Sequence, residues 1–109
     1  MVRPVFRYDV HLIDLNPTRG SEIKKVRPCV VVSPDEMNRH LRTVVIAPMT
    51  SVQRDYPTRV NITFQQKDGQ VVLDQIRTVD KSRLVKRLGR LPEEQARQVA
   101  ALFVRMFSY

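Results

Sequence analysis

Short segments rich in β-branched residues, separated by turn residues, make up most of this chain, and only its last segment is long and helical. The alternation and the β-branched content predict strands over 8–15, 28–33, 43–49, 59–64, 71–79 and 85–88. The fifth of these segments carries Asp74-Gln75, where we expect a bend. Many short strands followed by one helix indicate a mainly β fold, namely a small, strongly curved antiparallel sheet or partial barrel with short helices.

Turn residues mark the connections between these segments. Asn16-Pro17 opens the first loop and Gly20 marks its bend. Lys67-Asp68-Gly69 is typical of a hairpin turn. We expect a polar loop over 50–58 and a helical turn over 80–84.

Two segments have the features of helices. Ser33 is a suitable cap and Pro34 a suitable first residue for a short helix that ends near His40. Pro92–Phe107 is the clearer helix, because Pro92 suits its first position and two glutamates follow. Its apolar face, which we expect to pack on the sheet, consists of Ala96, Val99, Ala100, Phe103 and Phe107, widened by Leu102 and Met106.

Length and composition indicate one folded domain spanning 1–109. The chain has 109 residues, of which 42% are hydrophobic and 28% charged. Its first residues lack the apolar core of a signal peptide, and no apolar run approaches the ~18 to 20 residues of a membrane helix. The single cysteine, Cys29, cannot form an internal disulfide and lies in an apolar run, as expected of a small buried hydrophobe. We therefore expect a cytoplasmic protein.

The net charge of +8 favours polyanionic partners such as nucleic acid, a membrane surface or an acidic protein. A soluble basic protein without such a partner could have the same net charge, so the placement of the charges along the chain is stronger evidence for a binding site. The first basic cluster is Arg19, Lys24, Lys25 and Arg27, opposed by the acid Glu22. It lies in a turn-rich loop that leads directly into a strand, which is a good way to hold a cation against an anionic substrate.

A second basic cluster follows later in the chain. It consists of Arg77, Lys81, Arg83, Lys86, Arg87 and Arg90, opposed by Asp80. Such a run is either a solvated face or, if it converges with the first cluster across a curved sheet, part of a groove that follows phosphates. The aromatic residues best placed to stack on bases are Phe6, Tyr8 and Tyr56, and Tyr56 is the first choice, against simple packing.

Several classes of site are disfavoured. His11 and His40 lack a Cys/His cluster or a zinc-protease pattern, so we expect no metal site and no cofactor. The three glycines form neither a P-loop nor a dinucleotide-binding motif. A ribonuclease needs neither group: the ribose 2′-hydroxyl attacks the adjacent phosphorus while a base, a charge-stabilising donor and an acid assist. Arg27 and Thr50 lie at the ends of consecutive predicted strands, where a curved sheet could bring them together.

Four blocks of sequence resemble those of the MazF/PemK/Kid family of toxin–antitoxin ribonucleases. They occur in order from about Asp9 to the last helix and read GSEIKKVRPCVVVSPDEMN, IAPMTS, YP and VLDQIRTVDKSRL. The resemblance implies a small SH3-like barrel with a packed C-terminal helix, acting as a homodimer. It also implies metal-independent, sequence-specific cleavage of single-stranded RNA to 2′,3′-cyclic phosphate and 5′-hydroxyl ends. A cognate antitoxin with an acidic segment would block the groove, and the pair would bind operator DNA.

The same resemblance assigns the site residues. The functional arginine before proline matches Arg27, and the threonine two residues after proline matches Thr50. The glutamate of the first block matches Glu22, which would help shape the RNA site. Residues expected to bind RNA are Arg19, Lys24, Ser51, Tyr56, Asp74, Gln75 and Arg77.

Two departures favour the Arg27/Thr50 arrangement over a histidine–aspartate–arginine arrangement. Some relatives carry His where this chain has Ser21, and some carry Arg where it has Val72. Arginine is a poor base at neutral pH because its pKa exceeds about 12, so Arg27 is assigned chiefly to the phosphate. Glu22, solvent and Arg27 itself remain candidates for the base.

Two other readings remain open. A toxin of the same fold class poisons DNA gyrase by binding it, without cutting RNA. A nucleic-acid-binding repressor would bind duplex DNA alone, whereas a toxin would do so mainly with its antitoxin.

Overall fold

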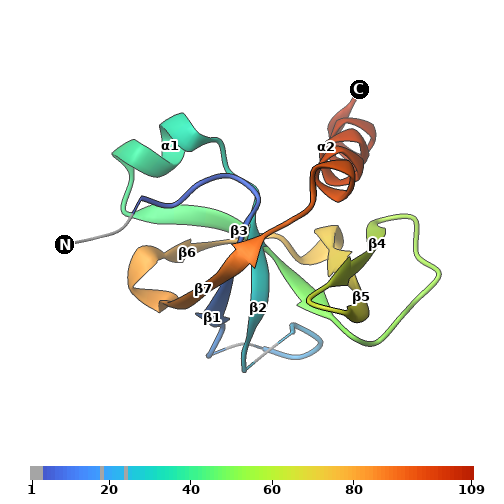
Figure 1. Ribbon diagram of the computed structural model, residues 1–109, viewed down its shortest axis with the longest axis horizontal. Coiled ribbons are helices and arrows are strands. Elements are labelled where there is room, and N and C mark those ends of the chain that lie inside the picture. Colours follow the sequence, from blue (N-terminus) through green and yellow to red (C-terminus); the bar gives the residue numbers. More distant parts are fainter. Residues whose placement is uncertain (1–3, 18, 24) are drawn as a thin grey trace.

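A single seven-stranded sheet that curls on itself forms the body of the protein, and a long helix packs against it (Figure 1). The computed structural model describes residues 4–17, 19–23 and 25–109. The strands are β1 Asp9–Asp14, β2 Val26–Val31, β3 Thr43–Thr50, β4 Arg59–Phe64, β5 Lys67–Val72, β6 Arg77–Asp80 and β7 Leu84–Arg90. The helices are α1 Asp35–His40 and α2 Glu93–Phe107, with 3₁₀ turns η1 Leu73–Gln75 and η2 Lys81–Arg83. The mainly β prediction, with its curved antiparallel sheet, is confirmed.

Strand β3 organises the sheet, whose order is β4-β5-β3-β2-β1-β7. On one side β3 pairs with β2. On the other side its first half pairs with β6 and its last two residues pair with β5. All of these ladders are antiparallel. Because β3 passes from one set of neighbours to the next, its C-terminal end lies where β2, β3 and β5 meet.

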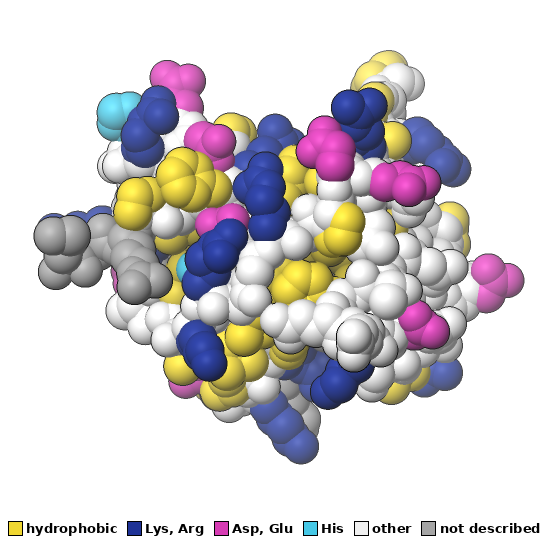
Figure 2. Space-filling view, viewed as in Figure 1, with side chains coloured by type: hydrophobic (Ala, Val, Ile, Leu, Met, Phe, Trp, Pro, Cys, Tyr) yellow, Lys and Arg dark blue, Asp and Glu magenta, His cyan; other side chains and the backbone are white. Residues whose placement is uncertain are grey.

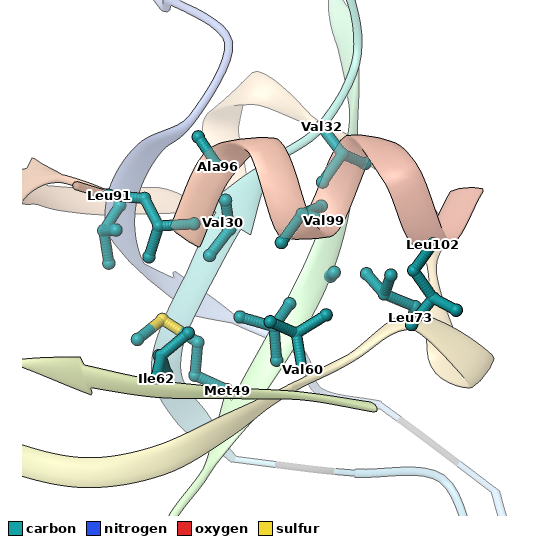
Figure 3. Packing of buried hydrophobic residues seen from close by; sticks show 13 residues of the cluster. Val30, Val32, Met49, Val60, Ile62, Leu73, Leu91, Ala96, Val99 and Leu102 are labelled. Carbon is teal, nitrogen blue, oxygen red and sulfur yellow. The ribbon is translucent and has the colours of Figure 1, made fainter. Parts of the chain in front are cut away.

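The main core lies between α2 and the concave sheet (Figure 3). Ala96, Val99 and Leu102 are buried against residues such as Val30 and Val60. Leu102, expected only to widen the apolar face, is therefore part of its centre. Phe107 is 68% exposed, so its assignment to the buried face is wrong. The helix extends beyond the sheet at this end, and Phe107 stacks on Phe103 instead.

Several local predictions need correction. The β4–β5 turn is Gln65-Gln66, whose φ angles are 51° and 66°, while Lys67-Asp68-Gly69 belongs to β5. Two consecutive left-handed residues match the right-handed twist of a two-residue hairpin. The predicted strand 71–79 is divided by η1, and the last strand extends to Arg90.

Ser33 does not cap α1, whose N-cap residue is Pro34. The Ser33 hydroxyl accepts a hydrogen bond from the Val45 N–H at 3.0 Å and donates one to the Asn38 side chain. The competing bond to β3 thus occupies the side chain that was expected to cap the helix.

Among the described residues, no helix is long and apolar enough to cross a membrane.

Candidate active site

The register of β2 and β3 brings Arg27 and Thr50 together. In this antiparallel pair Cys29 lies opposite Pro48, and extending the register by two residues places Arg27 opposite Thr50. Side chains in such positions start about 5 Å apart on the same face of a sheet. The guanidinium of Arg27 also donates to the Met49 carbonyl at 3.5 Å. Two residues that are 23 positions apart in sequence are therefore neighbours.

A pocket of about 330 Å³ contains both side chains. Its lining residues are Arg27, Pro28, Met49, Thr50, Ser51, Ile62, Phe64, Gln65, Lys67, Asp68, Gly69 and Leu88. Ser51, expected to bind RNA, is therefore at this site. Of the residues that line the pocket, Asp68 is the only acid. Sequence reasoning missed Lys67 and Asp68 because both were assigned to a turn, whereas they belong to β5 and line the same pocket as Thr50.

The backbone at Thr50 is held closely by β5. A Cβ atom added to Gly69 would lie 2.6 Å from the Thr50 carbonyl oxygen, so only glycine fits there without a shift of β3. The Thr50 hydroxyl accepts the Val52 N–H at 3.1 Å, which fixes the start of the following loop. The Thr50 backbone is thus held by its pairing with β5, and its hydroxyl is held by the Val52 N–H.

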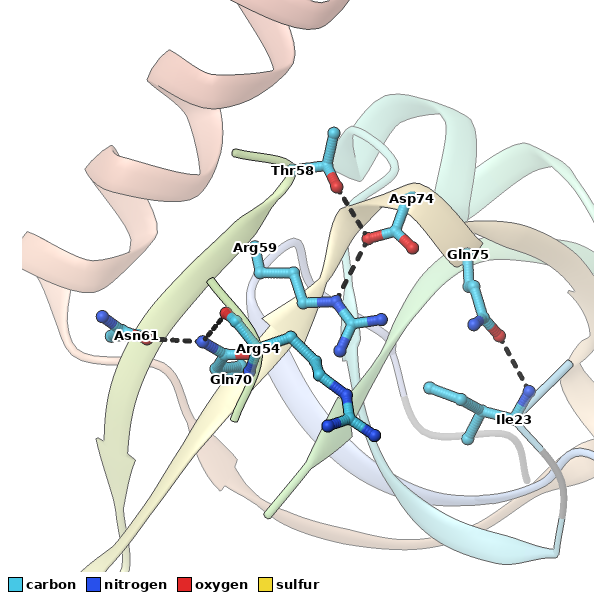
Figure 4. Close-up of polar contacts among 8 residues, drawn as sticks. All are labelled: Ile23, Arg54, Thr58, Arg59, Asn61, Gln70, Asp74 and Gln75. Atoms are coloured by element: carbon cyan, nitrogen blue, oxygen red, sulfur yellow. Dashed lines mark hydrogen bonds and ion pairs between the residues drawn. The ribbon is translucent and has the colours of Figure 1, made fainter. Parts of the chain in front are cut away.

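A second pocket, of about 380 Å³, contains Glu22, predicted as a catalytic residue, and three of the residues predicted to bind RNA. Glu22, Asp74, Gln75 and Arg77 line it, together with Ser21, Ile23, Pro48 and Ile76. The Gln75 side chain accepts the Ile23 N–H at 2.8 Å and so ties the basic loop to η1 (Figure 4). The structure therefore places Glu22 in a different pocket from Arg27 and Thr50.

The remaining predicted residues have structural contacts of their own. Arg77 donates to the Leu15 carbonyl at 3.1 Å, and the Arg19 N–H donates to the Glu22 carboxylate. Asp74 accepts the Thr58 hydroxyl at 2.9 Å and pairs with Arg59 at 3.4 Å (Figure 4). Lys24 lies outside the described residues.

Tyr56 lies in none of the pockets described above. It is 51% exposed, and the Arg59 guanidinium lies 4.8 Å from its ring centroid. One face of the ring is therefore occupied by a cation, and any base that stacks on Tyr56 would use the other face.

The loop that follows Thr50 depends on Gln70, which sequence reasoning missed. Gln70 is 4% exposed, and its amide both accepts the Arg54 N–H at 3.0 Å and donates to the Arg54 carbonyl at 2.9 Å (Figure 4). It also donates to the Asn61 side chain at 2.8 Å. A glutamine on a β-branched strand gave no signal of this role, because the contact depends on the path of the loop.

Cys29 is not arranged as a nucleophile. The register places His11 opposite Cys29, a proximity that the sequence spacing did not reveal. However, burial raises the pKa of the Cys29 thiol to about 12, so the thiol stays protonated and weakly reactive at neutral pH. The interpretation as a buried hydrophobe stands. Within the described part of the chain, no three His, Cys, Asp or Glu side chains are grouped to hold a metal ion.

The fold and this pair of pockets define a small β domain with Arg27 and Thr50 in one pocket, and comparisons with known proteins identify its family. Residues 6–107 match the family model described as PemK-like, MazF-like toxin of type II toxin–antitoxin system. The endoribonuclease MazF of Staphylococcus saprophyticus is 37% identical over 99 residues, covering 85% of this chain and 82% of that protein. The chain belongs to the PemK-like, MazF-like toxin family.

Solved structures agree with this fold. MazF from Deinococcus radiodurans superposes with a TM-score of 0.86 at 23% identity, covering 99% of this chain and 100% of that one. A mycobacterial endoribonuclease, solved in complex with its cognate antitoxin, superposes with a TM-score of 0.79 at 25% identity over 93% of this chain and 92% of that one.

Proposed function

We propose that this protein is the toxin of a toxin–antitoxin module and acts as a sequence-specific endoribonuclease on single-stranded RNA, without a metal ion. The observation that carries the proposal is the shared pocket of Arg27 and Thr50. These are the two positions to which the sequence resemblance assigns the arginine and threonine of the family's site. The 37% identical relative is an endoribonuclease, which supports the same activity.

The proposed reaction uses the RNA's own nucleophile. The 2′-hydroxyl gives up its proton to a base as its oxygen bonds to the adjacent phosphorus. The bond from phosphorus to the 5′-oxygen breaks, and that oxygen takes up a proton. The products are a 2′,3′-cyclic phosphate and a 5′-hydroxyl. Arg27 stabilises the charge that builds on the phosphoryl oxygens, and the Thr50 hydroxyl hydrogen-bonds to the same group. Because Glu22 lines the neighbouring pocket, we assign it to shaping the RNA site rather than to removing the 2′-proton.

The partners follow from the family and the charge. We propose a homodimer in the cytoplasm whose RNA groove is blocked by an acidic segment of a cognate antitoxin, and which binds operator DNA only together with that antitoxin. The structure of a mycobacterial endoribonuclease in complex with its cognate antitoxin supports an antitoxin as the protein partner. The net charge of +8 also favours both polyanionic RNA and an acidic inhibitor.

Cleavage of a long single-stranded RNA in the presence of EDTA tests the proposal. We expect Arg27→Ala and Thr50→Ala each to lower the cleavage rate roughly 10²- to 10³-fold, as loss of a charge-stabilising donor does. Arg39→Ala and Thr78→Ala are matched controls, because both side chains are exposed on other elements, and they should cut like the wild type. Mapping of the ends should show a cyclic phosphate and a 5′-hydroxyl.

Two results would contradict the proposal. One is the absence of cleavage across RNAs of varied sequence, especially with gyrase-dependent DNA breakage in its place. The other is wild-type cleavage by both Arg27→Ala and Thr50→Ala.

A further inference from the structure

A row of polar residues crosses four strands and begins at the proposed catalytic pair. Thr50 lies opposite Gln70 in the β3–β5 ladder, and Gln70 lies opposite Asn61 in the β5–β4 ladder. With Arg27 opposite Thr50 in the extended register, the row runs Arg27, Thr50, Gln70, Asn61 on one face of the sheet. Neighbouring strands lie about 4.8 Å apart, so Asn61 starts about 10 Å from Thr50.

A pocket of about 290 Å³ lies at the far end of this row. Gln53, Asn61, Thr63, Asp68 and Gln95 supply its polar groups. It shares Ile62, Asp68 and Gly69 with the Arg27/Thr50 pocket, so the two pockets adjoin. Three amides around one apolar residue, Ile62, form a small site suited to a flat polar ring rather than to a phosphate.

Hydrogen bonds fix the orientation of these side chains before any ligand is present. The Asn61 oxygen accepts from Gln70 at 2.8 Å, which directs the Asn61 NH₂ group away from Gln70 (Figure 4). Gln70 is in turn held by the Arg54 backbone. On the adjoining rung, the Asp68 carboxylate accepts the Thr63 hydroxyl at 2.8 Å. The pocket is therefore preorganised, with Asn61 as a donor and Asp68 as an acceptor.

Gln95 closes one side of the pocket. Its NH₂ group donates to the Thr63 carbonyl at 3.4 Å, and its oxygen is buried without a hydrogen-bond partner in the described structure. Because this oxygen has no accessible surface, Gln95 acts as a wall of the pocket and does not present an acceptor to a ligand. Gln95 belongs to the first turn of α2, so its position is fixed by the packing of that helix.

The charge of the pocket favours binding of a base over binding of a backbone phosphate. Asp68 lines both adjoining pockets, but Arg27 and Lys67 accompany it only in the Arg27/Thr50 pocket, and no Lys or Arg among the described residues lines the pocket around Asn61. A phosphate is therefore favoured in the Arg27/Thr50 pocket, whereas in the pocket around Asn61 the Asp68 carboxylate can accept a hydrogen bond from an amino group. Adenine, cytosine and guanine carry an exocyclic amino group as well as ring acceptors, whereas uracil carries no amino group. The Asp68 carboxylate matches the amino donor, and the Asn61 NH₂ group matches a ring acceptor.

We propose that this pocket, built from Asn61, Asp68 and Gln95, binds a nucleobase bearing an exocyclic amino group, within about two nucleotides of the scissile phosphate. The proposal rests on the proposed ribonuclease function and assigns part of its sequence specificity to the β4–β5 hairpin and the start of α2. Uracil is disfavoured at this position because it has carbonyl oxygens where the other bases have an amino group, and a carbonyl oxygen facing the Asp68 carboxylate would be repelled.

Sequencing of the 5′-hydroxyl ends from a random-sequence RNA library tests this inference. The wild type should discriminate against uracil at one position near the cut by about ten-fold or more, as expected for a well-made base contact. Asn61→Asp retains the oxygen that accepts from Gln70 but replaces the donor with an acceptor. It should therefore change preference at that position alone by about ten-fold, and Gln95→Ala should relax it. Gln98→Ala, an exposed glutamine on the same helix, is the matched control and should leave the motif unchanged.

A binding measurement tests the base pocket independently of RNA cleavage. Thr50→Ala protein should bind oligo(A) or oligo(C) about ten-fold more tightly than oligo(U), and the added Asn61→Asp or Gln95→Ala change should remove most of that difference. Identical motifs and identical binding preferences in Asn61→Asp, Gln95→Ala and wild type would overturn the inference. If the wild type cuts no RNA but the binding preference behaves as expected, the ribonuclease function fails while the base pocket stands.

Discussion

The two basic clusters of this protein are similar in sequence but differ in what their guanidinium groups contact. The first cluster, residues 19–27, delivers Arg27 to the pocket that also contains Thr50. The second, residues 77–90, uses its arginines to hold the N-terminal part of the chain. Arg77 donates to the Leu15 carbonyl at 3.1 Å and Arg83 to the Asp14 carbonyl at 3.1 Å.

The same anchoring continues at the other end of β1. Arg87 and Arg90 lie 3.2 and 3.7 Å from the buried Asp9 carboxylate, and Arg90 also donates to the Arg7 carbonyl at 2.9 Å. Lys and Arg side chains are nevertheless prominent down the middle of the face shown in Figure 2, over β7 and β1. A basic surface seen on this face therefore does not by itself mark the RNA site. The hydrogen-bond partners of each cation decide its role.

The largest expected effect is a loss of folding stability when Asp9, the carboxylate that pairs with Arg87 and Arg90 of the second cluster, is replaced. Asp9→Ala removes a buried carboxylate that accepts the Phe6 N–H at 3.2 Å and pairs with two half-exposed arginines. We expect the free energy of unfolding to fall by about 2 kcal/mol, from one lost backbone hydrogen bond and two weak, solvent-screened pairs. Urea denaturation measures it. Asp55→Ala, an exposed acid in the 51–58 loop, is the control and should change stability little.

The comparison becomes sharper if activity is measured on the same protein. Asp9→Ala should cut RNA at the wild-type rate per folded molecule, whereas Arg27→Ala should be stable and inactive. Unchanged stability together with lost cleavage in Asp9→Ala would instead make the second cluster part of the RNA site.

Local patterns predicted much of the fold because they act over a few residues. The fourth strand, 59–64, agrees in its bounds with β4, and the terminal helix differs from α2 by one residue at its start. The hairpin turn was misplaced because Gln65-Gln66 lacks the Gly or Asn that usually marks left-handed positions. The position of this turn follows from the register between β4 and β5, which cannot be read from a single sequence.

The candidate site was partly predictable for the same reason. Arg27 and Thr50 lie at the ends of rigid strands, and the extended β2–β3 register places them together. Glu22 lies in a loop whose path depends on the bond from the Ile23 N–H to Gln75, 52 residues away in sequence. The amide pocket also depends on distant contacts, since Gln53, Asn61 and Gln95 come from a loop, a strand and a helix.

A smaller effect should appear in the salt dependence of RNA binding. Arg19 is exposed in the basic loop. Arg90, in contrast, forms an ion pair with Asp9 and donates a hydrogen bond to the Arg7 carbonyl. For Arg19→Ala we expect the slope of log affinity against log salt to become less negative by about 0.7, the value for one lost phosphate contact on a single strand. For Arg90→Ala the slope should stay the same. Fluorescence anisotropy with the Thr50→Ala protein measures both, and a reversed result would exchange the roles of the two clusters.

The smallest effect concerns pH and the buried His11 beside Asp9. His11 is 8% exposed, and burial lowers its pKa below the usual value of 6.5, opposed by the charge of Asp9 and aided by that of Arg87. Below pH 6.5 the unfolded chain therefore takes up this proton before the folded protein does, so the stability that depends on neutral His11 is lost as the pH falls through its folded pKa. His11→Gln should lose less stability than the wild type between pH 7.5 and 5.5 in urea denaturation, while His40→Gln, exposed at the end of α1, should follow the wild type. Parallel pH profiles for His11→Gln and wild type would show that His11 is protonated as readily in the folded protein as in the unfolded chain. The Asp9 and His11 side chains beside the second cluster would then be solvated rather than buried.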